Sequence, residues 1–278
     1  MRPTPQSVVL KFGLLTDPIE SVPAEIRLFK RLDFDYAEIG IEEPRATPQI
    51  LMGESQEILK ALSETGLFPI GHTAYWVGFG SSHESVRRGW VEEGKEMIRT
   101  AAQLKIRFLN FHYNARLGRV GAKEESRETF VQNFVNSMRE LAGVASLMQI
   151  ELMLENSPPQ GLYPLEGIEY FERVLDAVPS LKFHFDVAHA FIENRMKGVQ
   201  QYLDAFADRL VHVHMHDNHG KQDEHLALGG GKIDFRKVIR ALKAVDYNRT
   251  ITFEVFTSRT DAARSRDAFK KRWERACK

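Results

Sequence analysis

The chain of 278 residues has a single cysteine, no excess of charge and no long apolar run. Cys277 is alone, which excludes an intrachain disulfide framework and a thiolate-rich zinc site and leads us to expect a reducing, cytoplasmic location. Basic and acidic side chains number 38 each, so no global field favours nucleic acid or an anionic membrane as partner. No stretch approaches the roughly 20 apolar residues that span a bilayer, and we expect neither a signal peptide nor a membrane segment.

Linkers rich in proline or serine, low-complexity tracts and charge blocks are also missing, so the sequence gives no reason to divide the chain. With 43% hydrophobic residues, a chain of this length can bury a substantial core. We therefore expect a single domain over residues 1–278.

Short β-branched or aromatic runs alternate with longer amphipathic segments along the whole chain, which predicts parallel strands joined by helices. The predicted strands span residues 8–15, 36–40, 68–72, 107–112, 149–155, 181–186, 210–214 and 250–254. The predicted helices span residues 24–32, 56–65, 84–104, 125–148, 165–177, 199–206, 235–245 and 261–275. Eight such units in about 250 residues are the size of a (β/α)₈ TIM barrel. A doubly wound sheet is the alternative, but ligands from six strand ends would lie spread along an open sheet, whereas they converge on the axis of a barrel.

Acidic residues end apolar runs at three similar places in the chain. Glu155 ends the run LMLE, Asp186 ends LKFHFD, and Glu254 ends the ITFE run. An unpaired carboxylate in apolar surroundings is costly, and a bound metal would remove that cost. For one acid alone, a structural salt bridge is an equally good explanation. Three acids in equivalent positions, joined by histidines, favour a metal site.

Histidines accompany these acids at strand ends. His72 and His112 end two earlier strands, and His189 follows Asp186 at the start of a loop or a helix turn. Each histidine alone is more often a hydrogen-bonded core residue, but together they extend a ring of ligands. Asp223 and His225, two residues apart in a later loop, can hold a second ion, although such a pair alone is weak evidence.

The segment LVHVHMHDNHG is the richest in histidine. Strand alternation places His212, His214 and His216 on one face. We take His214 as a metal ligand and His212 as a core or supporting histidine, and we expect His216 and His219 in a loop. For the glycines that follow, Gly229–Gly231, an ordinary turn and a cradle for a phosphate or sugar oxygen are equally good readings.

Aromatic and acidic residues near the ligands are candidates for substrate binding. Tyr75 and Trp76, beside His72, can wall a sugar or stack on a base. Glu38 also ends a strand and can bind substrate hydroxyls, as His189 can.

The C-terminal helix is strongly basic but does not by itself indicate nucleic acid. In this fold the C-terminal end of a helix lies on the opposite side of the barrel from the ligands, so a solvated helix face is expected. Its basic residues are Arg264, Arg266, Lys270, Lys271, Arg272, Arg275 and Lys278.

The motifs LENS, FDVAH, HMHDN, DEHLALGGGKIDF and FEVF occur in the order in which the xylose isomerase-like superfamily has them, and the chain resembles that superfamily over nearly its whole length. In the epimerase branch, the resemblance implies that four residues hold one divalent ion: Glu155, Asp186, His214 and Glu254. In endonuclease IV nine ligands hold three zinc ions, and the counterparts of all nine are His72, His112, Glu155, Asp186, His189, His214, Asp223, His225 and Glu254.

Two branches of the family therefore remain as explanations. Tyr75 and Arg45 resemble positions that the endonuclease branch uses on DNA. Glu38 in DYAEIG and the DEHLALGGGKIDF stretch look more like the sugar branch, and Glu42 and Glu43 would repel a phosphate backbone passing Arg45.

The favoured hypothesis is a divalent-metal-dependent isomerase or epimerase, or a dehydratase, that acts on a small sugar or sugar phosphate. Glu155 and Glu254 would act as base and acid next to a carbonyl, and the cation would stabilise the negative charge that develops on oxygen. The alternatives are a zinc phosphodiesterase acting on abasic DNA and a metal-binding protein without turnover. One to three ions of zinc, manganese, cobalt or magnesium fit these ligands, and a homo-oligomer stays open.

Overall fold

The computed structural model describes residues 10–114, 117–159 and 167–276, in which eight strands alternate with helices. The strands are β1 (Lys11–Leu15), β2 (Tyr36–Ile41), β3 (Phe68–Thr73), β4 (Phe108–His112), β5 (Glu151–Glu155), β6 (Lys182–Asp186), β7 (Leu210–His214) and β8 (Thr250–Thr252). All eight predicted strands are confirmed, with small shifts at their ends. Residues 8 and 9 of the first predicted strand lie outside the described residues.

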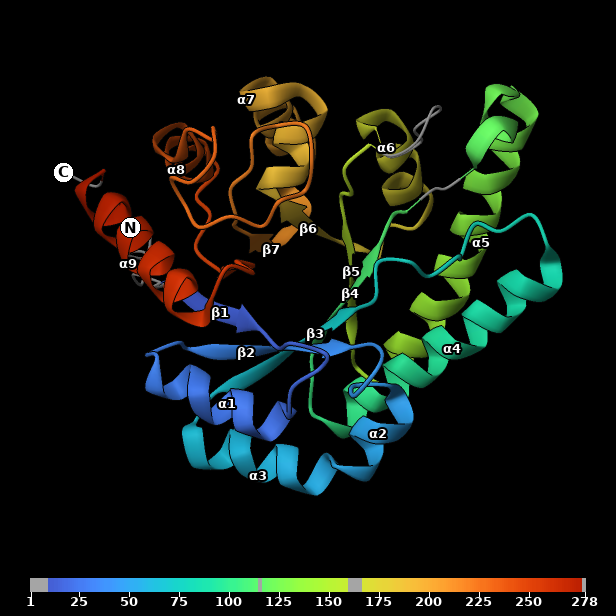
Figure 1. The fold of residues 1–278 in the computed structure, drawn as a ribbon. Coiled ribbons are helices and arrows are strands. Elements are labelled where there is room, and N and C mark those ends of the chain that lie inside the picture. The colour runs from blue at the N-terminus through green and yellow to red at the C-terminus, as the bar shows by residue number, and fades with distance from the viewer. Residues whose placement is uncertain (1–9, 115–116, 160–166, 277–278) are drawn as a thin grey trace, which may run out of the picture.

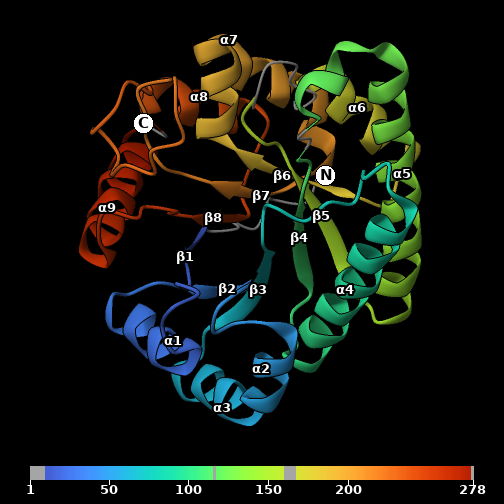
Figure 2. The same ribbon diagram turned by 45° about the vertical axis from the view of Figure 1, so that its right-hand side comes forward.

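The strands close into a barrel in chain order, and each neighbouring pair is parallel. Figures 1 and 2 show the strands at the centre of the molecule and the helices around them. The closed barrel confirms the predicted (β/α)₈ architecture and excludes the doubly wound open sheet. Because all strands run the same way, their carboxyl ends meet at one rim.

Nine α-helices surround the barrel in the described residues. They are α1 (Val22–Arg31), α2 (Pro48–Gly53), α3 (Ser55–Thr65), α4 (Glu84–Gln103), α5 (Glu124–Leu147), α6 (Ile168–Ala177), α7 (Val187–Phe206), α8 (Phe235–Ala244) and α9 (Arg259–Arg275). Their buried residues recur at helical spacing, as Val238, Ile239 and Leu242 do on α8. None of the helices in these ranges is long and apolar enough to cross a membrane.

Two helical segments differ from the prediction. The short helix α2 was not expected; the Thr47 side chain caps it, and Pro48 stands in its first turn. Helix α7 begins at Val187, twelve residues before the predicted start at 199. Asn194 and Arg195 have non-helical backbone angles, and this kink interrupts the apolar period that the prediction relied on.

The interior of the barrel is apolar toward the amino ends of the strands and polar toward their carboxyl ends. Tyr36, Ile70, Met153 and Val211 form a buried cluster that we call the lower layer. Two residues further along three of these strands, the inward positions carry ionisable groups: Glu38, His72 and Glu155. The buried ionisable groups therefore lie toward the carboxyl rim, above an apolar layer.

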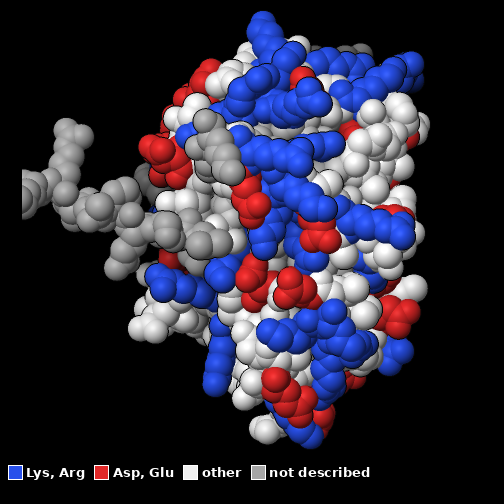
Figure 3. Space-filling view, turned by 90° about the vertical axis from the view of Figure 1, so that its left-hand side faces the viewer, with Lys and Arg blue, Asp and Glu red and all other residues white. Residues whose placement is uncertain are grey.

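Figure 3 shows lysine and arginine side chains gathered on the outer face that carries α9. The exposed basic residues of this helix are Arg264, Lys270, Lys271, Arg272 and Arg275. Arg266 does not belong to this solvated face, contrary to the prediction, because it is only 7% exposed and donates a hydrogen bond to the Leu32 carbonyl. Lys278 lies outside the described residues.

Candidate metal centre and active site

Buried ionisable side chains from six strands and from the segment after β8 meet at the carboxyl rim of the barrel. Each is at most 7% exposed. In chain order they are Glu38, His72, His112, Glu155, Asp186 and His214, with Glu254 two residues after β8. Parallel strands alone bring these distant positions together, as the sequence predicted for the metal ligands.

Glu155 lies at the centre of this group. Its Oε2 accepts a hydrogen bond of 2.6 Å from Asn110 and lies 2.9 Å from His112 Nε2 and 3.6 Å from His72 Nε2. Burial by itself would raise the pKa of Glu155, but the surrounding histidines, His184 foremost, hold it well below its ordinary value. The carboxylate is therefore ionised and suited to a divalent cation.

His214 lies between two carboxylates of different strands. Its Nε2 is 3.0 Å from Glu38 Oε2, whereas its Nδ1 is 3.3 Å from Glu254 Oε2 and 3.8 Å from Glu155 Oε1. Burial lowers the pKa of His214, but the adjacent carboxylates, led by Glu38, raise it well above its ordinary value. Glu38 accepts the Nε2 proton of His214 and so directs Nδ1 toward Glu155 and Glu254. Carboxylates orient histidine ligands in metal sites in the same way.

Glu38 lies beneath the site and does not line the cavity, although the sequence suggested that it binds substrate. It is fully buried, and its carboxylate contacts His212 at 3.1 Å as well as His214 and the Thr252 hydroxyl. Burial opposes ionisation of Glu38, but the two histidines bring its pKa well below the ordinary value. His212 is a supporting histidine, as expected from its depth in the strand.

Asp186 joins strand β6 to helix α7. One carboxylate oxygen accepts a hydrogen bond of 2.6 Å from the His189 backbone N–H and caps the helix, and the other lies 3.1 Å from His216 Nε2. The Asn156 side chain holds the backbone of Asp186 through two hydrogen bonds of 2.9 Å. His189 is therefore in the first turn of α7, placed by the same aspartate that is a candidate ligand.

A second group of candidate ligands lies closer to the surface. Asp223 Oδ2 is 3.0 Å from His189 Nε2 and 3.1 Å from His225 Nε2. His189 Nδ1 lies 2.8 Å from the Asn156 carbonyl, which leaves Nε2 to face Asp223. Burial opposes the charged form of His225, but Glu254 and Asp223 raise its pKa to about 9. All nine ligands predicted from the sequence thus converge on one region.

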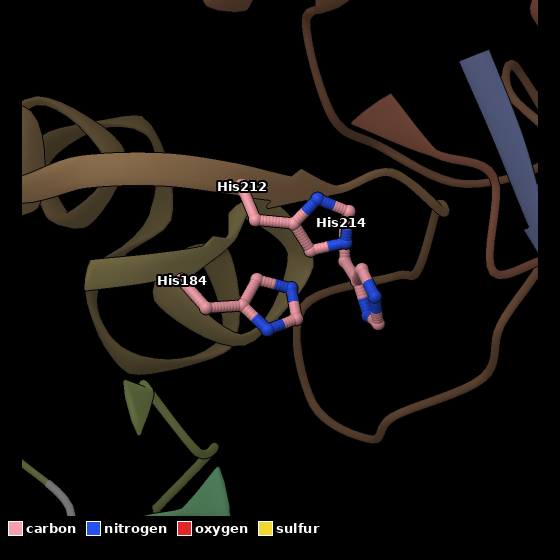
Figure 4. A group of neighbouring side chains, drawn as sticks. All are labelled: His184, His212 and His214. Atoms are coloured by element: carbon pink, nitrogen blue, oxygen red, sulfur yellow. The ribbon is translucent and has the colours of Figure 1, made fainter. Parts of the chain in front are cut away.

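Two buried histidines of this region were not predicted as part of the site. His216 is fully buried and contacts Asp186, and strand alternation with His214 is the signal that could have found it. His184 lies deeper, beside His212 and His214, as Figure 4 shows, with its Nδ1 3.4 Å from Glu155 Oε2. It stands two residues before Asp186, which the same alternation indicates.

Above these side chains lies a cavity of about 530 Å³. Glu155, His189 and Glu254 line it, and Tyr75 stands beside it with half of its surface exposed. Trp76, predicted as a second wall, lines a neighbouring groove instead. Successive residues after β3 thus serve two different hollows.

The glycines at 229–231 do not offer their amides to a substrate anion. The N–H groups of Gly229 and Gly231 each donate a hydrogen bond of 2.9 Å to Asp217, which also accepts one of 3.1 Å from Ile233. Asp217 is itself fully buried. The loop is therefore tied down by an internal acid, and the ordinary-turn reading is the better one.

The donor atoms of the site fit a divalent cation. In the described residues, several buried ring nitrogens form no hydrogen bond, and such groups are costly unless a ligand satisfies them. They include both nitrogens of His72 and the Nδ1 atoms of His112, His214 and His216. Ligand atoms of His72, His112 and Glu155 lie within 4.8 Å of one another, as do those of Asp186, His189 and His216. Mixed carboxylate and imidazole donors suit zinc, manganese, cobalt or magnesium.

The chain is similar to a family of TIM barrels and to several sugar epimerases. A family model described as xylose isomerase-like TIM barrel matches residues 26–273. The chain is 28% identical to L-ribulose 3-epimerase of Methylomonas sp. (strain DH-1) over 82% of its own length and 76% of the relative. It is 25% identical to fructoselysine 3-epimerase of Escherichia coli O157:H7 over 89% and 91% of the two chains.

A solved structure of a D-tagatose 3-epimerase-like protein superposes with a TM-score of 0.82 at 24% identity, covering 95% of this chain and 97% of that one. Two uncharacterised proteins of Methanocaldococcus jannaschii match at 25% and 31% identity, and the alignments span about half of their length, 48% in each case.

Proposed function

Because the chain belongs to the xylose isomerase-like TIM barrel family, we propose that it is a divalent-metal-dependent isomerase or epimerase of a ketose or related sugar. The epimerases to which it is similar are named for L-ribulose and fructoselysine, both of which carry a ketone beside a hydroxyl-bearing carbon. The proposal itself depends on the site, since this fold hosts many activities.

The observation that carries the proposal is the position of two carboxylates around one imidazole nitrogen. Glu155, at the end of β5, and Glu254, after β8, both face His214 Nδ1, at 3.8 and 3.3 Å. Burial opposes ionisation of Glu254, but His214 and His225 lower its pKa to about 2. Both acids are therefore ionised at neutral pH and able to accept a proton.

Glu155, Asp186, His214 and Glu254 would hold the ion. When bound, a divalent cation supplies a Lewis acid that stabilises negative charge on the substrate oxygens. One carboxylate removes the proton from the hydroxyl-bearing carbon beside the ketone. The other takes a proton from solvent and delivers it to the opposite face of that carbon, which inverts the centre, and the first carboxylate then releases its proton to solvent. Removal of a proton from the terminal hydroxymethyl carbon beside the ketone, with return of a proton to the former carbonyl carbon, instead gives aldose–ketose isomerisation.

The remaining residues position these groups. Glu38 holds His214 by its Nε2 proton, and Asn110 holds Glu155 through one carboxylate oxygen. His189, fixed by the Asn156 carbonyl at Nδ1, lines the cavity and can steady a substrate oxygen with Nε2. Tyr75 lies beside the cavity, where it can cover the sugar.

The test is proton exchange in heavy water. The protein is incubated with manganese, cobalt or magnesium and a panel of ketoses, and deuterium beside the ketone is measured by NMR. We expect incorporation that disappears with a chelator. Exchange should be unchanged in Glu64→Gln, which removes an exposed carboxylate on α3. No exchange with any ketose and any of the three ions would overturn the proposal.

The second group of ligands favours one further candidate, a zinc phosphodiesterase. Asp223 with His189 and His225 gives places for additional ions, and several metals can activate water against a phosphodiester. A count of bound metals by anomalous scattering separates the two: one ion fits sugar chemistry and three fit hydrolysis. Zinc-dependent nicking of an abasic duplex, abolished in Asp223→Ala, would replace the sugar proposal.

A further inference from the structure

A groove of about 610 Å³ adjoins the site cavity. Its apolar wall includes Trp76 and Trp90, whose ring centroids lie 5.4 Å apart at 70°, and Val86. Trp76 is 40% exposed and Val86 is 49% exposed. We call this feature the tryptophan groove; its other wall carries Glu42, Glu43 and Glu93.

The tryptophan groove and the site cavity are lined by residues of the same two chain segments. Glu42 lines both hollows. On the segment after β3, Ala74 and Trp76 line the groove, whereas Tyr75 between them lines the cavity. The groove is therefore the neighbouring surface for a substituent on a sugar bound in the cavity.

The charge of the groove has one sign. Its lining includes three glutamates but no lysine, arginine or histidine. Across the described ranges, Glu43 and Glu93 form no ion pair and accept no hydrogen bond at their carboxylates, and the only opposite charge that acts on Glu42 is that of His72 in the site cavity. The residue before Glu93 on the same helix differs, because Glu92 forms an ion pair with Lys95 at 2.8 Å. Burial and the neighbouring acids Glu96 and Glu43 raise the pKa of Glu93, as expected of carboxylates without a counter-charge.

Aromatic faces beside unpaired carboxylates suit an organic cation. The negative face of an indole attracts an ammonium group, and the carboxylates add a Coulombic attraction. The same carboxylates repel a phosphate. An uncharged alkyl group would gain contact with Trp76 and Trp90 but would leave the glutamates unpaired.

We propose that the tryptophan groove is the subsite for a positively charged amine carried by the substrate, so that the enzyme takes an amine-bearing ketose in preference to a free or phosphorylated one. This inference rests on the proposed function, because the ketose portion must occupy the site cavity. Trp76 and Trp90 hold the arm, and Glu43 and Glu93 pair with its ammonium group.

Binding of matched ligands tests the inference. The probes are fructose linked at C1 to a 5-aminopentyl arm, the same compound with the terminal amine acetylated, and fructose 1-phosphate. Isothermal titration gives Kd for each with the metal-loaded protein, and quenching of tryptophan fluorescence reports contact with the groove. We expect the free amine to bind roughly ten-fold more tightly than its acetylated partner, and fructose 1-phosphate to bind more weakly than either.

Three variants locate the preference in the groove. In the double variant Glu43→Gln with Glu93→Gln, and separately in Trp76→Leu, the ratio of the two Kd values should fall to about two or less. Glu92→Gln, on the same helix but outside the groove, should keep the ratio of the native chain. Because Trp76 is well exposed, its replacement gives a second test if the double variant does not fold.

Equal affinity for the free and acetylated arms would overturn the inference, and so would a preference that survives both groove variants. The proposed function fails separately, by the lack of deuterium exchange with every ketose. If the free amine binds more tightly than its acetylated partner but no ketose exchanges deuterium, the amine subsite is supported and the proposed reaction is rejected.

Discussion

The two layers of the barrel interior use the same strands for opposite purposes. In the lower layer, Tyr36, Ile70 and Met153 fill the barrel and contribute by burial. Two residues further along β2, β3 and β5, the inward side chains become Glu38, His72 and Glu155. Here the free energy of burial opposes the charged groups, and only mutual pairing or a bound ion offsets it. The same strand thus places an apolar side chain that stabilises the fold near its amino end and an ionisable side chain of the candidate site near its carboxyl end.

The largest effect is expected from Glu155→Gln in the polar layer. The substitution keeps the shape of the side chain but removes the charge that faces His112 and His214, so deuterium exchange should fall by about 10²–10⁴-fold. NMR of the exchanging ketose measures the rate, and thermal unfolding checks the fold. A rate within a few-fold of the native one would remove Glu155 from the catalytic role.

Met153→Ala, in the lower layer of the same strand, should change stability and leave the reaction alone. Met153 is fully buried, and truncation leaves a cavity that lowers the free energy of unfolding by about 2–5 kcal/mol. Urea unfolding measures that loss, and exchange per folded molecule should stay near the native rate. If activity were to fall as far as in Glu155→Gln, the separation of the two layers would be lost.

The pH dependence of stability should also differ between the layers. In the metal-free protein the pKa of His225 is raised to about 9. Its stabilising contribution is thus fully present below the ordinary value of about 6.5 and is lost as pH rises through about 9, by on the order of 2 kcal/mol. His225→Asn should flatten this alkaline decline in urea unfolding, whereas Met153→Ala should shift the whole profile down in parallel. If the pH profile of His225→Asn ran parallel to that of the native chain, the alkaline decline would not come from His225.

A smaller change is expected from Glu38→Gln, at the boundary between the layers. Glu38 does not line the cavity but orients His214, so metal affinity should weaken by about 10–100-fold. Competition with a chelating dye measures the metal Kd, with Glu64→Gln as the control. An unchanged Kd would make Glu38 merely structural.

Much of the fold and the site was predictable because period and strand ends are local signals. The alternation of β-like runs and amphipathic segments predicts the eight strands, and acids or histidines at the ends of those runs predict the candidate ligands that the barrel brings together. The first half of α7 was missed because a kink at Asn194 and Arg195 disturbs the period. His184 and His216 were missed although they share the inward face of strand residues that were chosen.

Other features depend on neighbours that no local pattern reveals. Glu38 and His214 are 176 residues apart in the chain, yet they touch across the closed barrel. The carboxylate of Asp217 accepts hydrogen bonds from the Gly229 and Gly231 N–H groups, which the sequence left available to a bound anion. Trp76 packs against Trp90 rather than facing the site cavity.

The amino-acid sequence by itself determined that eight β/α units form and that carboxylates and imidazoles stand at their strand ends. Both follow from local signals, because the spacing of hydrophobic residues and the order of residues along the chain can be read directly from the sequence. Only the tertiary structure decided which of these groups face the cavity and which lie beneath it. Closure of the barrel sets the distances between side chains of different strands, and those distances control pairing, pKa and access to the cavity. The same closure placed Glu38 under the site and the unpaired glutamates beside two tryptophans.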